Sequence, residues 1–67
     1  MSKKGIISAL RARYDADMLA ADATINIYLT NSVGIGEHPK HLQEIDKLLA
    51  NIGHAKEKLE SLEAFEK

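Results

Sequence analysis

The sequence has no cysteine, no strong excess of charge of either sign and no long apolar run. Without cysteine, the chain has no disulfide to stabilise it, and its fold does not depend on redox conditions. Nine basic and ten acidic side chains give a net charge of −1, so no global field attracts nucleic acid or an acidic membrane. The N-terminal apolar run is broken by charges, unlike a secretion signal or a membrane span. We expect a soluble protein, with any anion binding confined to a local patch.

The chain is also short. Sixty-seven residues make one domain at most, and a chain of this size buries only about 60% of the surface that its unfolded form exposes. Small domains usually supplement such a thin core with disulfides, a structural metal or association with another chain. Because disulfides are excluded, the sequence predicts association or a metal.

Apolar residues recur in steps of three and four along two segments, as in the seam of a coiled coil. The first segment contains Ile7, Leu10, Tyr14, Met18, Ala21, Ile25 and Tyr28. The second contains Ile45, Leu48, Ile52, Ala55, Leu59 and Leu62. These patterns predict helices over about residues 5–31 and about residues 39–65. The stretch TINIYLT, residues 24–30, also has strand propensity, but the chain offers no second strand to pair with it.

The two seams match each other when the chain reverses at residues 32–38. Tyr28 then meets His41. In two further pairs, Ala21 with Leu48 and Tyr14 with Ala55, a large side chain faces a small one, which favours close packing. Asn31 is expected to end the first helix, Gly34 or Gly36 to take the left-handed conformation of the turn, and Pro39 to begin the second helix. The predicted fold is therefore all-α, an antiparallel two-helix hairpin that forms a single domain over residues 1–67.

Several large apolar residues fall outside both seams, among them Ile6, Leu19 and Phe65. Six others cluster near the bend, and we interpret them as an interface with a second copy or another protein: Ile27, Leu29, Val33, Ile35, Leu42 and Leu49. In the alternative interpretation, Val33 and Ile35 only fold back over the end of the hairpin. Because the core is thin, we favour the interface and expect a dimeric four-helix bundle.

The histidines suggest a metal site only in a dimer. His38 and His41 have the spacing of two ligands on one metal, but His54 lies about 20 Å farther along the helix at ~1.5 Å per residue. A symmetric dimer would have to join two such pairs, so we prefer His38 as a helix cap and His41 stacked on Tyr28. The glycines of GIG follow no strand and are interpreted as turn residues. We expect no catalytic residues, no bound cofactor and no enzymatic activity.

A basic cluster at the N-terminus gives an alternative function. Lys3, Lys4, Arg11 and Arg13 would form a local RNA-binding patch, although pairing of Arg11 with Asp15 and Arg13 with Asp17 would neutralise much of it. A second such pair, Lys56 with Glu60, is expected on the second helix.

The phrase VGIGEHP and the helix after it resemble a family of small uncharacterised proteins of marine T4-like phages, cyanophages among them. The resemblance covers residues 26–65, NIYLTNSVGIGEHPKHLQEIDKLLANIGHAKEKLESLEAF, although Asn31-Ser32 replaces the family's Asn-Pro. It implies a phage protein in the cytoplasm of an infected host and nothing more about function. The partners that we expect, a second copy and a host or phage protein, follow from the apolar residues outside the seams. The architecture is also similar to that of Rop, a plasmid protein whose helical hairpins dimerise and bind paired RNA loops, but shape alone does not transfer function.

Overall fold

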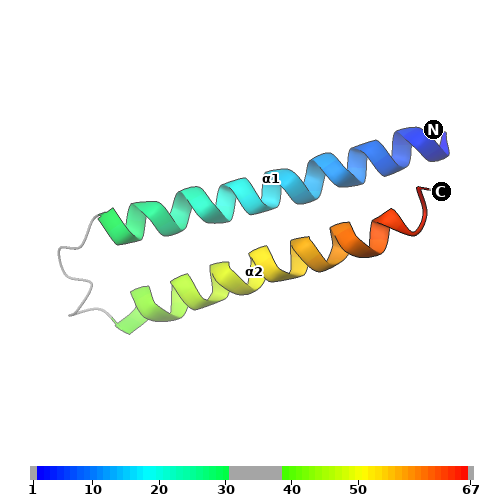
Figure 1. Cartoon of the computed structure of the whole chain (residues 1–67). Coiled ribbons are helices and arrows are strands. Elements are labelled where there is room, and N and C mark those ends of the chain that lie inside the picture. Colours follow the sequence, from blue (N-terminus) through cyan, green and yellow to red (C-terminus); the bar gives the residue numbers. More distant parts are fainter. Residues whose placement is uncertain (1, 31–38, 67) are drawn as a thin grey trace.

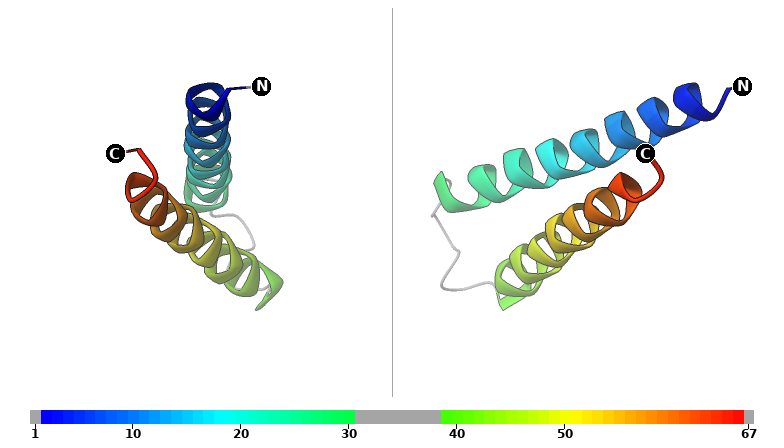
Figure 2. Two further views of the ribbon diagram at one scale, coloured as in Figure 1. Left: turned by 90° about the vertical axis from the view of Figure 1, so that its right-hand side faces the viewer. Right: turned by 45° about the vertical axis from the view of Figure 1, so that its right-hand side comes forward.

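A computed structural model describes residues 2–30 and 39–66. Helix α1 covers Lys3–Thr30 and helix α2 covers Pro39–Glu63. The helices run antiparallel, and both ends of the chain lie at the end of the hairpin opposite the bend (Figure 1). Their axes are inclined to each other, as two further views show (Figure 2). The predicted all-α hairpin is confirmed, and the described residues contain no strand.

Helix α1 begins two residues before the predicted start, because Ser2 caps it. The Ser2 hydroxyl accepts a hydrogen bond from the N–H of Gly5 at 3.0 Å, and the Ser2 carbonyl accepts one from the N–H of Ile6 at 2.9 Å. Serine at this position satisfies N–H groups that have no partner within the helix. The helix thus begins two residues before the predicted start at about residue 5.

The segment with strand propensity, residues 24–30, is helical. Its polar side chains bond back to the preceding turn: the hydroxyls of Thr24 and Thr30 donate to the carbonyls of Ala20 and Asn26, each at 2.8 Å. The Asn26 amide donates to the Asp22 carbonyl at 3.0 Å. These polar groups thus have hydrogen-bond partners within the helix. The prediction of a helix for this segment is confirmed, and the alternative of a strand is not. The described part of α1 ends at Thr30, so Asn31 and the rest of the predicted bend lie outside the described residues.

Helix α2 begins at Pro39, as predicted, but it ends at Glu63 and not at residue 65. After Leu62 the backbone hydrogen bonds join residues three apart instead of four. The N–H of Ala64 donates to the Ser61 carbonyl at 3.3 Å, that of Phe65 to the Leu62 carbonyl at 2.9 Å, and that of Glu66 to the Glu63 carbonyl at 3.2 Å. Such bonds satisfy some of the carbonyls left without partners at a helix end. The exposed Phe65 therefore lies in a turn.

The seam between the helices is where the sequence places it. Every seam residue of both helices, His41 included, is buried or half-buried. The rings of Tyr28 and His41 meet with centroids 5.1 Å apart and an interplanar angle of 44°, so the pair is tilted and not stacked face to face. Near the other end, the Lys58 ammonium lies 5.4 Å from the centroid of the Tyr14 ring. These contacts fix the register of the hairpin.

The core inside this seam is small. Within the described part of the chain, only Ala21, Ala55 and Leu62 are buried, and no large side chain is fully buried. The hairpin measures 49 × 15 × 14 Å and has a radius of gyration of 15.5 Å. A compact globule of this length would have about 11 Å. The two helices therefore cover only one stripe of each other.

Candidate functional site

The surface predicted as an interface is apolar and exposed where the structure describes it. Leu42 is 75% exposed and Leu49 is 54% exposed, and both lie on the same side of α2, seven residues apart. With Ile45 they line a shallow groove whose polar members are Gln43 and Asp46. This groove offers apolar area at a helix surface, with two polar groups at its edge.

The predicted interface residues of α1 do not share one face. Ile27 and Leu29 are both about 60% exposed, at 61% and 59%. They are two residues apart, which places them about 200° apart around the helix axis. Leu29 therefore lies at the side of the hairpin, whereas Ile27 lies on the side of α1 that is turned away from α2. Val33 and Ile35 lie outside the described residues, as do the predicted turn residues Asn31, Gly34 and Gly36.

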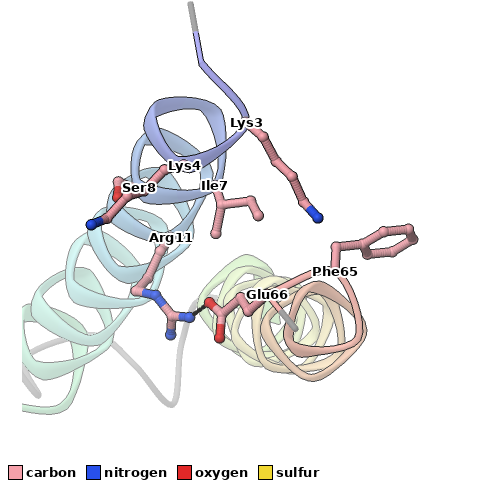
Figure 3. A pocket seen from close by; sticks show the side chains of 7 residues that line it. All are labelled: Lys3, Lys4, Ile7, Ser8, Arg11, Phe65 and Glu66. Carbon is pink, nitrogen blue, oxygen red and sulfur yellow. Dashed lines mark ion pairs between the residues drawn. The ribbon is translucent and has the colours of Figure 1, made fainter.

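A second candidate surface lies at the open end of the hairpin. Here Lys3, Lys4, Ile7, Ser8 and Arg11 of α1 meet Phe65 and Glu66 of the C-terminal turn around a groove of about 490 Å³ (Figure 3). Phe65 is 64% exposed, and the sequence predictions include it only as a residue outside the seam. The chain reversal brings it to the N-terminal lysines, as the predicted register implies, because the numbers of Lys4 and Phe65 have the same sum as those of Tyr28 and His41.

The charges at this groove differ from those expected. Arg11 forms an ion pair with Glu66 (Figure 3), and neither Arg11 with Asp15 nor Arg13 with Asp17 forms one in the described part of the chain. The predicted Lys56–Glu60 ion pair is likewise absent from residues 39–66. Arg13 does not line the groove, since it lies two residues from Arg11 and thus about 200° around α1. Of the four predicted RNA-binding residues, Lys3, Lys4 and Arg11 come together, and Glu66 balances the charge of Arg11.

The described histidines lie far from each other. His41 contacts Tyr28 near the bend, while His54 lies beside Asp17, Asn51 and Lys58 in the middle of the hairpin. Residues 2–30 and 39–66 contain no group of three or more histidine, aspartate or glutamate side chains placed to hold a metal ion. His38, the partner in the predicted metal pair, lies outside these ranges.

Neither helix contains a stretch both long and apolar enough to cross a membrane, as judged over the described residues. Comparisons with protein-family models, curated proteins and solved structures find no match to this chain. The candidate surfaces are therefore argued from their own chemistry.

Proposed function

We propose that this protein is a self-associating helical module that acts by binding another protein. The observation that carries the proposal is the imbalance between its core and its surface. Three residues are buried, whereas seven large apolar side chains are at least 44% exposed among those described. Single exposed apolar residues are common, but so many on a chain with so small a core are typical of a binding surface.

The total surface supports the same proposal. The chain exposes 5293 Å². A compact monomer of the same mass would expose about 4200 Å², so the hairpin shows roughly 1100 Å² in excess. A standard protein interface buries about 800 Å² on each partner. The excess is thus large enough for one interface with a second copy, which in its simplest form is a dimeric four-helix bundle.

Sedimentation and thermal unfolding over a concentration series test this proposal. If dimerisation supplies part of the stability, both the mass and the melting temperature rise with concentration from ~1 μM to ~1 mM. A monomeric mass together with an unchanged melting temperature over this range would contradict the proposal. A pull-down from infected cells then tests the phage setting that the resemblance implies, with a host or phage protein as the expected partner.

RNA binding is a second candidate, favoured by the exposed Phe65, which lines one groove with Lys3 and Lys4. Aromatic side chains stack on unpaired bases, and lysines contact phosphates. An RNA titration at several salt concentrations distinguishes it, because phosphate contacts release counterions and affinity falls steeply with salt. Absence of binding at low salt would remove this candidate. A dimer-bridging metal site is tested separately, since a chelator would lower both the melting temperature and the mass if such a site existed.

A further inference from the structure

The side of α1 that is turned away from α2 carries an unbroken apolar stripe. Between Gly5 and Ile27, no polar or charged residue falls within an arc of about 100° on this side of the helix, over a length of roughly 33 Å. All members of the stripe from Ala9 onward are exposed, and Leu19 and Ile27 are 70% and 61% exposed. We call this stripe the outer face of α1, and it comprises Gly5, Ala9, Ala12, Ala16, Leu19, Ala20, Ala23 and Ile27. Leu19 and Ala20 lie at its two edges, where each also lines an open groove with residues of α2.

Helix α2 provides the comparison within the same chain. Its side turned away from α1 carries Gln43, Asp46, Glu57 and Ser61, with Ala50 among them. A helix that packs against one neighbour is polar on its opposite side, and α2 follows this pattern. Helix α1 does not, because it is apolar on two opposite sides. Such a helix is suited to a position between two packing partners.

We infer that the outer face of α1 binds the outer face of α1 in a second copy, in antiparallel orientation. This inference rests on the proposed self-association and specifies its contact. The excess surface of roughly 1100 Å² per chain exceeds the ~800 Å² that a standard interface buries on each partner. Alanine side chains let two helix axes approach to about 8 Å, the close end of the usual range. Arg13 and Asp15 lie at the edges of the stripe and remain in water, as at the rim of an ordinary interface.

The sizes of the side chains favour the antiparallel orientation. An antiparallel pair brings together positions whose numbers sum to about 36, so that Ile27 faces Ala9 and Leu19 faces Ala16. Each large side chain then meets a small one. A parallel pair would place Ile27 on Ile27 and leave Ala9 opposite Ala9, with gaps at the alanines and crowding at the large residues. In the antiparallel dimer the two α1 helices are central and both α2 helices are peripheral, so the four helices form a row and not a four-helix bundle around one shared core. Leu42 and Leu49 remain available to another protein.

Glutamate substitutions test the contact by sedimentation. Ala16→Glu places a charge at the centre of the proposed interface, so we expect the dimer to weaken by about a hundredfold or more. Glutamate is a good helix former and Ala16 is exposed in the single hairpin, so the helix content should be kept. Ala50→Glu on the polar side of α2 is the matched control and should leave the affinity unchanged. A double Leu42→Ser, Leu49→Ser variant should also still dimerise.

The outcomes separate this inference from the proposed function. A monomeric natural sequence would overturn both. A dimer that survives Ala16→Glu but dissociates in the Leu42/Leu49 double variant would leave self-association standing and overturn the outer face as its contact. Loss of the dimer with Ala16→Glu alone supports the inference.

Cysteine crosslinking tests the orientation independently, and the natural chain has no cysteine to interfere. When Ala9→Cys and Ile27→Cys variants are mixed and oxidised, the antiparallel contact gives a disulfide-linked heterodimer, while each variant alone gives little crosslinking. Efficient crosslinking of Ala9→Cys with itself would show a parallel pair and overturn the proposed orientation. Absence of any crosslink in a dimeric sample would overturn the contact.

Discussion

Replacing Gly53 with alanine should stabilise the hairpin. Gly53 lies in the interior of α2, where glycine costs about 0.8 to 1.0 kcal/mol relative to alanine because it loses more backbone freedom on folding. A Cβ added at this position meets no atom within 4 Å. The added methyl group therefore causes no clash, and the full helix-propensity gain of about 1 kcal/mol is expected. For a domain of this size, that gain raises the melting temperature by roughly 4–8 °C.

Circular dichroism at fixed protein concentration measures this change. Ala50→Gly is the matched control, because Ala50 is exposed on the polar side of the same helix and should lose about the same 1 kcal/mol. The pair of variants thus brackets the natural protein. Destabilisation by Gly53→Ala would refute the reasoning, since it would mean that another chain packs closely enough on Gly53 to exclude a methyl group. In the double variant the two changes in the free energy of unfolding should cancel, provided that the two sites do not interact.

Three further substitutions examine the packing, the cap and the ion pair. Ala55 is 3% exposed, so Ala55→Leu should overpack the seam and lower the free energy of unfolding, measured by chemical denaturation, by about 1–3 kcal/mol. Ala50 is exposed, so Ala50→Leu should change that free energy by no more than about 0.5 kcal/mol, and equal effects of the two variants would mean that the seam is loosely packed. Ser2→Ala removes the α1 cap and should cost about 1 kcal/mol, while Ser2→Asp should retain the natural melting temperature; no loss with alanine would show that the cap contributes nothing. Arg11→Met breaks the ion pair with Glu66. The side chains of Arg11 and Glu66 are 43% and 33% exposed, so the free energy of unfolding should fall by less than about 1 kcal/mol at physiological salt, and a fall of more than about 2 kcal/mol would show that solvent does not screen this pair.

The hairpin follows from the spacing of apolar residues along the chain, and its register follows from pairing positions whose residue numbers have a constant sum. Apolar residues spaced by three and four define a stripe on each helix, and only one reversal point aligns the two stripes along their whole length. The contact of Tyr28 with His41 confirms that register. The helix over residues 24–30 was also predictable, because an isolated strand leaves its backbone groups without partners while a helix satisfies its own.

The charges and the ends of the helices were harder to predict. Helix periodicity places Arg11 near Asp15, but the chain reversal brings Glu66 to Arg11, and that contact depends on the turn after Leu62. Local spacing contains no information about it. The early start of α1 at Lys3 was predictable in principle, because Ser2 is a good cap and sits directly before the helix.

The candidate surface shows a different limit. Nearness to the bend along the chain predicts that Ile27 and Leu29 belong to one surface. Around a helix, two residues apart means nearly opposite sides, so angular position decides which side chains can meet a common partner. Grouped by angle, Ile27 joins Leu19 and the alanines, and Leu29 lies apart from them.

Two opposite apolar stripes also explain why α1 has a less obvious pattern than α2. When apolar residues occupy both sides of a helix, their directions cancel, and periodicity alone makes the helix look weakly amphipathic although it has more apolar positions. The spacing of apolar residues along α1 then identifies one stripe, and the residues of the other stripe look scattered. Within the hairpin, α2 covers one of these stripes, and the outer face of α1 stays exposed. If a second copy covers this outer face, as we propose, folding and association of this chain are coupled, and its stability depends on its concentration.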